Sequence, residues 1–223
     1  MSEWWTYSLS SFLLFSPRTY YRLFELYNTA IWPAQWLALA LGFVVFVLLL
    51  RPAPWRGRCI AAILVAGWLW VTWFYLLRHY DTINWAASYF AIGFAIEALL
   101  LLGTGAALDR LHFGSPLSFI GASGLSMVAV ALAYPLVGPL LIGRPWNQAE
   151  MFGVAPDPTV LATLGVLTAA GRPHWHLLIV PAIWCAISGA TLWAMESPDA
   201  LIMPAAGAIA LVLAARKSLA RTA

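Results

Sequence analysis

Long apolar runs without a charged residue are the feature that most limits how this chain can fold. Residues 36–50 and 60–77 form two such runs, and the charges fall almost entirely between runs of this kind. Charged residues make up 9% of the chain, whereas soluble domains carry about 25%. We therefore predict an all-α, polytopic transmembrane helix bundle whose main partner is the lipid bilayer.

A transmembrane helix needs about 20 mainly apolar residues, and this pattern predicts seven spans. Pro135 and Pro139 should kink the fourth span. Several tryptophans lie near the ends of the runs, where aromatic belts are expected, whereas Trp68, Trp70 and Trp184 lie deeper and are interpreted as packing residues. The predicted spans cover residues 31–50, 59–77, 83–102, 119–142, 158–171, 175–195 and 201–215.

The chain divides into an N-terminal interfacial amphipathic segment (1–30), the helix bundle (31–215) and a cytoplasmic basic tail (216–223). Ser16-Pro17 is a typical helix start, and Arg18, Arg22 and Glu25 follow on one face. We predict a helix that lies in the bilayer interface with its aromatic side inward. Packing of that side against the protein's own spans is the alternative, and residues 12–15 form a further apolar patch expected at the interface.

The fifth span is irregular. Asp157 is predicted to be the N-cap of a helix that begins at Pro158 and ends near Gly171. Such a helix is about 20 Å long, too short for a hydrocarbon core of about 30 Å. The stretch around Pro156 should therefore enter the membrane as non-helical chain, sheltered by protein or by a water-filled cavity. Six spans plus one re-entrant half-helix is the alternative topology.

In both topologies, eight Lys and Arg residues lie on the cytoplasmic side of the membrane and four on the other side. Both topologies place the C-terminus in the cytoplasm. We favour seven spans because the short loop 51–58 carries three arginines. Small residues predict close helix contacts in three spans. They are Gly121, Ala122, Ser123, Gly124 and Ser126; Ala182, Ala186 and Ala190; and Ala206, Ala210 and Ala214.

Glu97 lies inside the third span, about five residues from its predicted end. A carboxylate in hydrocarbon is unfavourable by a few kcal/mol, so it should face the bundle as a proton or cation site, or as a protonated or paired structural residue. Asp157 would bind ions at a half-helix N-terminus, or act as a cap alone. Arg144 would line the same path. Arg172, His174 and His176 are further candidates for an ion path and could pair with Glu97.

Other classes of function lack support in the sequence. His174 and His176 have no third metal ligand nearby, so we predict neither a metal nor a cofactor. Cys59 and Cys185 are expected to remain unpaired because they lie at different depths. The net charge of +3 is spread over loops and does not predict nucleic-acid binding. No nucleophile–base arrangement stands out, so an enzyme is the least favoured reading.

Four stretches resemble an uncharacterised family of small bacterial multi-pass membrane proteins. They are Tyr27-Asn28, Trp32-Pro33-Ala34-Gln35, Ile83-Asn84-Trp85 and residues 152–159, the last of which contains Pro156 and Pro158. The resemblance implies a bacterial inner (cytoplasmic) membrane protein and implies no activity, because the family is a domain of unknown function.

Two functional hypotheses follow. The first is a small transporter or channel for protons, cations or small solutes, with Glu97 as the buried ionisable group and the broken segment around Asp157 and Arg144 lining the path. The second is a non-catalytic accessory or assembly subunit that packs against a larger membrane complex. The small-residue faces also fit a homo-oligomer.

Overall fold

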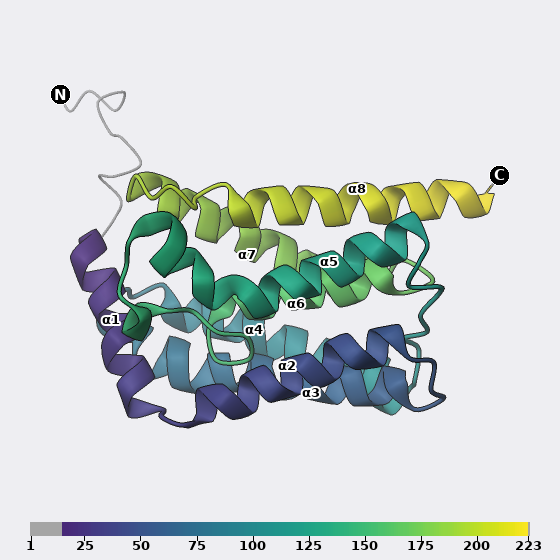
Figure 1. The fold of residues 1–223 in the computed structure, drawn as a ribbon, viewed down its shortest axis with the longest axis horizontal. Coiled ribbons are helices and arrows are strands. Elements are labelled where there is room, and N and C mark those ends of the chain that lie inside the picture. The colour runs from purple at the N-terminus through teal and green to yellow at the C-terminus, as the bar shows by residue number, and fades with distance from the viewer. Residues whose placement is uncertain (1–14, 223) are drawn as a thin grey trace.

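The computed structural model describes residues 15–222, which form a bundle of eight main helices (Figure 1). The helices are α1 (Pro17–Ala30), α2 (Ala34–Leu50), α3 (Arg56–Trp70), α4 (Ala87–Leu101), α5 (Phe119–Ala133), α6 (Pro156–Ala169), α7 (Trp175–Ala194) and α8 (Ile202–Thr222). Short 3-10 or π-helical turns follow several of them: η3 (Val71–Leu77), η4 (Tyr80–Thr82), η5 (Leu102–Ala107), η6 (Tyr134–Leu136), η7 (Gly138–Ile142) and η8 (Trp146–Gln148).

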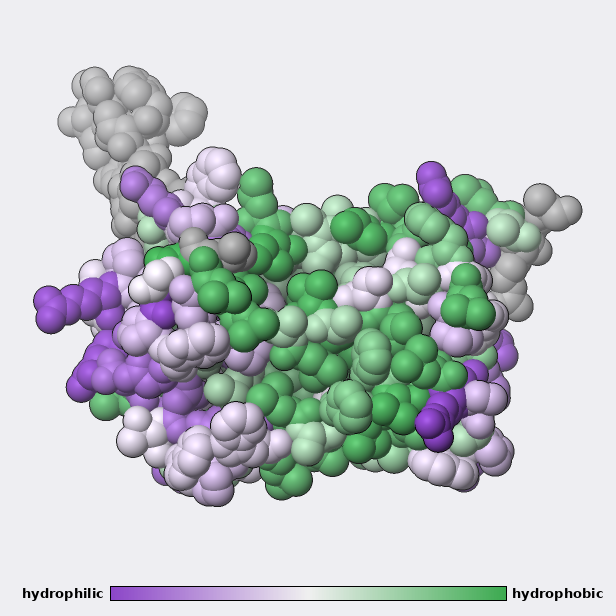
Figure 2. Space-filling view, in the orientation of Figure 1, coloured by the Kyte–Doolittle hydropathy of each residue, from purple (hydrophilic) through white to green (hydrophobic). Residues whose placement is uncertain are grey.

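Helix length and apolarity make this chain an integral multi-pass membrane protein. Five helical segments of the described residues are long and apolar enough to cross a bilayer, and the bent pair α1–α2 would add a sixth. The five are Arg56–Thr82, Ala87–Ala107, Phe119–Leu136, Trp175–Ala194 and Ile202–Ala220. Figure 2 shows hydrophobic residues in a band across the middle and hydrophilic residues gathered toward the ends. The multi-pass bundle is thus confirmed, with up to six such spans; α6, with 14 residues, is not among them.

Helix α1 lies across one end of the bundle and makes an angle of 92° with α2 (Figure 1). Its start is as predicted, because the Ser16 side chain accepts a hydrogen bond from the Thr19 N–H and Pro17 opens the helix. The aromatic side is buried: Phe24 stacks on Tyr75 of η3, with ring centres 5.2 Å apart. These contacts support the alternative reading, packing against the protein itself. Residues 12–14 of the predicted apolar patch lie outside the described residues.

Helix α6 is the innermost element. Every residue from Pro156 to Thr168 is buried, and α3, α5, α7 and α8 all contact the helix. The closest approach is to α5, where a Cβ atom built on Gly165 would lie 2.7 Å from the Gly124 carbonyl oxygen. The predicted close contact through Gly124 is therefore confirmed. The two predicted alanine faces differ in burial. Helix α8 buries Ala206, Ala210 and Ala214, whereas α7 exposes Ala186 and Ala190.

The chain before α6 enters the bundle without helical structure. Asn28 of α1 donates to the carbonyl oxygens of Asn147 and Ala149, so this segment starts at the α1 end. It then reaches the middle of the helical segment Arg56–Thr82, where a Cβ on Gly67 would meet the Gly153 Cα at 3.1 Å. At the far end of α6, the Gly171 N–H donates to the His112 carbonyl. The predicted sheltered, non-helical entry into the bundle is present.

The proline breaks in the fourth span are also as predicted. Helix α5 ends at Ala133, and the chain continues through the tighter turn η6, which contains Pro135, and the wider turn η7, which contains Pro139. A proline inside a helix removes a backbone donor and clashes with the preceding turn, which accounts for the change in helical pitch. These breaks end the regular part of the span before the chain turns toward Arg144.

Candidate functional site

Asp157 lies in the first turn of α6, and its carboxylate is bound from two other helical segments. The Trp184 indole N–H donates to Oδ1 over 2.7 Å, and the Ser188 hydroxyl donates to Oδ2 over 2.7 Å. The Tyr134 hydroxyl lies 3.4 Å from Oδ2. Trp184 and Ser188 belong to the central turns of α7, so the carboxylate lies deep within the bundle.

The predicted N-cap was wrong. Helix α6 begins at Pro156, its N-cap is Ala155, and no side chain caps it. Pro156 and Pro158 have no N–H groups, so two of the donors that a cap would satisfy are missing. The Asp157 carboxylate instead accepts bonds from α7, and its own helix is held by the Thr159 hydroxyl, which accepts from the Gly153 N–H.

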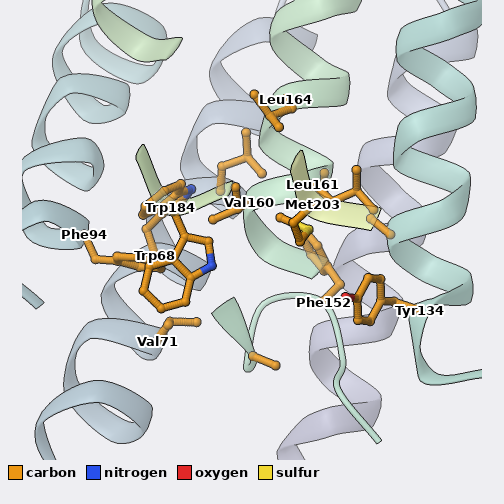
Figure 3. Packing of buried hydrophobic residues seen from close by; sticks show 14 of the residues in the cluster. Trp68, Val71, Phe94, Tyr134, Phe152, Val160, Leu161, Leu164, Trp184 and Met203 are labelled. Atoms are coloured by element: carbon orange, nitrogen blue, oxygen red, sulfur yellow. The ribbon is translucent and has the colours of Figure 1, made fainter. Parts of the chain in front are cut away.

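Aromatic side chains of the hydrophobic core pack beside Trp184, which donates to Asp157 (Figure 3). Phe94 lies between two tryptophans, with ring centres 4.4 Å from Trp68 and 5.0 Å from Trp184. The Trp68 indole N–H donates to the Thr163 hydroxyl of α6 over 2.9 Å. Phe152 and Tyr134 lie on the other side of Val160 in the same view. The deep tryptophans are packing residues, as predicted, and two of them also bind polar groups of α6.

A buried charge cluster lies in the loops beside α1. The Arg144 guanidinium is 3.6 Å from a Glu150 carboxylate oxygen and 3.5 Å from one of Asp199, and all three side chains are at most 8% exposed. The guanidinium also lies 4.3 Å from the centre of the Tyr21 ring. The Tyr21 hydroxyl contacts the Ser197 hydroxyl at 2.9 Å. The cluster therefore joins α1 to the loops that follow α5 and α7.

Acids outnumber cations in this cluster. Two buried carboxylates face the Arg144 guanidinium, and its contacts of 3.5 and 3.6 Å are longer than good hydrogen bonds. Glu150 and Asp199 thus share one guanidinium, whereas the Asp157 carboxylate is held by Trp184 and Ser188. Several of their polar atoms lack a hydrogen-bond partner within residues 15–222: Arg144 Nε and Nη1, Glu150 Oε2 and Asp199 Oδ2.

Glu97 faces the bundle, as the sequence predicted, but at a different depth. Turn η5 extends the span, so Glu97 lies at the centre of the 21-residue segment Ala87–Ala107 and not near its end. The side chain is fully buried one turn from Phe94, and neither carboxylate oxygen has a hydrogen-bond partner among the described residues. A carboxyl group without a polar partner is unfavourable at this depth of a bilayer.

Arg172, His174 and His176 lie at the opposite end of α6 from Asp157. The His176 Nε2 atom lies 3.0 Å from the Thr104 hydroxyl. Burial lowers the pKa of His174, as do the neighbouring His176 and Arg172. Among the described residues, none of these three side chains bonds to Glu97, and no group of three or more His, Cys, Asp or Glu is suited to a metal ion.

Sequence reasoning missed Glu150, Asp199, Trp184 and Ser188 as members of the site. Glu150 and Asp199 read as ordinary loop acids, because nothing local indicates that their loops fold back into the bundle. Lys217 was also missed: its ammonium group donates to the carbonyl oxygens of Thr168 and Ala170, so a cation from α8 binds the C-terminal end of α6.

Residues 18–223 match DUF6064, a family of unknown function. The chain belongs to this family. The match confirms the resemblance to an uncharacterised family, while a bacterial origin and a particular membrane remain predictions. No curated protein and no solved structure matches the chain. Any activity of this DUF6064 protein must therefore be inferred from its own buried polar groups.

Proposed function

We propose that this DUF6064 protein is a small transporter for protons or cations, with Asp157 and the Arg144 cluster as the group that binds and releases the proton. The observation that carries this proposal is the position of Asp157 at the N-terminus of a half-length helix deep in the bundle. Secondary transporters bind substrates and coupling ions at interrupted helices of this kind. Intramembrane ionisable residues are rare and unfavourable unless function retains them.

The balance of buried charges supports a proton as the transported ion. Glu150 and Asp199 beside one guanidinium, together with the buried Asp157, cannot all ionise without a net negative charge in a low-dielectric interior. A proton taken up by Glu150 or Asp157 would relieve that repulsion, and its release would restore it. Glu97 would be a second proton-binding group, reached from Asp157 past Trp184 and Phe94.

The proposal includes seven crossings, with segment 143–171 as the fifth. Support comes from its path between the Asn28 contacts at one end and the His112 contact at the other. Helix α6 would cover about 20 Å of a hydrocarbon core of about 30 Å, and the sheltered irregular chain before it would cover the rest. Eight basic residues would then lie on the side of the membrane that carries the C-terminus. The positive-inside rule makes this the cytoplasmic side of a bacterial inner membrane in our proposal.

The test is proton flux in liposomes that contain the purified protein and a trapped pH-sensitive dye, under an imposed potassium diffusion potential. The wild-type protein should acidify or alkalinise the interior at least about tenfold faster than protein-free liposomes. Asp157→Asn and Glu97→Gln should each abolish the difference, since an amide cannot carry the proton. Glu196→Gln is the matched control, because Glu196 is an exposed acid. Flux unchanged by Asp157→Asn would remove this carboxylate from the mechanism.

One observation favours an accessory subunit as the second candidate. Five cavities in residues 15–222 have linings that do not include Asp157, Glu97, Arg144 or Glu150. A buried polar cluster without a cavity can serve to fix one packing arrangement. Purification from native membranes separates the two ideas: stable stoichiometric subunits together with no flux of protons or cations would favour the accessory role.

A further inference from the structure

A basic pocket lies at the α1 end of the bundle, separate from the buried charge cluster. Three arginines line it: Arg18 and Arg22 from α1, and Arg78 from the turn after η3. His79 and Thr82 from that turn also contribute. The volume is about 840 Å³, within the range of about 300–1,000 Å³ that small-molecule sites occupy.

The pocket has an excess of positive charge. Glu25 is the acid among its lining residues, and Arg22 pairs with it. Arg18 and Arg78 have no ion-pair partner within residues 15–222. Like charges around one hollow repel each other, so an anion bound between them would relieve the repulsion. Arginine also offers the planar donor pair that matches phosphate oxygens.

The surroundings of the pocket indicate the headgroup level of a membrane. The Arg78 guanidinium lies 5.4 Å from the centre of the Trp73 ring, and Trp73 is half exposed on an apolar span. Tryptophan is enriched at this level of a bilayer. Leu26, which is 54% exposed, and Ile83 form an apolar part of the lining. A ligand with a phosphate head and acyl chains would satisfy both parts.

We propose that this pocket binds the headgroup of an anionic phospholipid, with Arg18 and Arg78 on the phosphate and Leu26 beside the first acyl methylenes. The geometry favours a lipid over a soluble anion because the arginines share the site with exposed apolar residues at the end of the spans. The bound lipid would tie α1 to the turn after η3. This inference does not depend on the transport proposal.

The test uses the full-length protein in nanodiscs of zwitterionic phosphatidylcholine with 20 mol% phosphatidylglycerol, followed by native mass spectrometry of retained lipid. The wild-type protein should retain one phosphatidylglycerol in preference to phosphatidylcholine. The double variant Arg18→Gln/Arg78→Gln should lose about 30-fold in affinity, which is about 2 kcal/mol. Arg18→Lys/Arg78→Lys should keep most of it, because the charge remains.

The matched control is Arg51→Gln/Arg216→Gln, which removes two exposed arginines elsewhere in the chain. It should retain the lipid as the wild type does. The proposal would be overturned if Arg18→Gln/Arg78→Gln retained the lipid as well as the wild type does. It would also be overturned if the control variant lost as much lipid as Arg18→Gln/Arg78→Gln. Displacement of the lipid by 10-fold excess inorganic phosphate would also overturn it, since that result identifies a site for soluble anions.

Discussion

The Trp184 indole nitrogen donates a hydrogen bond of 2.7 Å to Asp157 Oδ1, which ties the centre of α7 to the first turn of α6. Trp184→Phe keeps an aromatic ring against Phe94 but removes the donor. We expect a loss of about 1–3 kcal/mol in the free energy of unfolding, because a buried acceptor loses its partner. Unfolding in mixed micelles measures this change in the free energy of unfolding. Trp193→Phe, at an exposed position on the same helix, should change little; equal losses would contradict the role of the bond.

Arg144→Met should destabilise the protein more strongly, by about 3–5 kcal/mol, because Glu150 and Asp199 would remain buried without their cation. The triple variant Arg144→Met/Glu150→Gln/Asp199→Asn removes the charges together and should recover much of the loss. The measurement is again unfolding in mixed micelles. If the triple variant is no more stable than the single one, the ion pairs do not account for the effect.

Gly165→Ala tests the contact between α5 and α6. The added Cβ would lie 2.7 Å from a backbone oxygen of α5, so the helices must separate. We expect a loss of about 1–3 kcal/mol in the free energy of unfolding. Gly103→Ala is the control, since a Cβ there meets nothing within 4 Å and alanine favours a helix by about 1 kcal/mol over glycine. Similar melting temperatures for the two variants would contradict this packing.

His174 should make stability depend on pH. Burial lowers the pKa of the folded His174 below its ordinary value of 6.5. The unfolded chain therefore binds a proton first, and folding stability falls as the pH drops below about 6.5 until the folded pKa is reached. His174→Gln should remove this component. Melting temperatures from pH 8 to pH 5 provide the measurement. His112→Gln, an exposed position in the preceding loop, is the comparison and should change this component only slightly, because His112 lowers the pKa of His174 less than His176 or Arg172 does.

If the variant and the wild type lose stability in parallel as the pH falls, His174 is not the group responsible. The comparison at His112 also guards against a general effect of losing a histidine from this end of the bundle. The difference between variant and wild type is the informative quantity, because the carboxyl groups also titrate as the pH falls toward 5.

Local signals in the sequence were reliable where their causes are local. Ser16 and Pro17 predicted the start of α1, because capping depends on neighbouring residues alone. Pro135 predicted the end of regular helix for the same reason. The half-length of the helix after Asp157 could be read from Gly171 and from the prolines. Its non-helical approach then followed from bilayer thickness.

Non-local pairings could not be predicted in this way. The sequence predicts a cap or an ion site at Asp157 and gives no sign of its bonds to Trp184 and Ser188, because these partners lie 27 and 31 residues away. Arg144 and Asp199 meet through two loops far apart in the chain. The aromatic side of α1 could equally have faced lipid, since both lipid and protein interior accept the same apolar surface. Only the folded arrangement distinguishes these outcomes.

The complete burial of α6 bears on the order of biogenesis. During synthesis this segment emerges before α7 and α8, which provide Trp184, Ser188 and Lys217 as its polar partners. Until those helices arrive, Asp157 lacks its two shortest hydrogen bonds, and only the donor from Tyr134 precedes it in the described chain. We therefore expect α6 to reach its final packing late, after the C-terminal hairpin of α7 and α8 has been made.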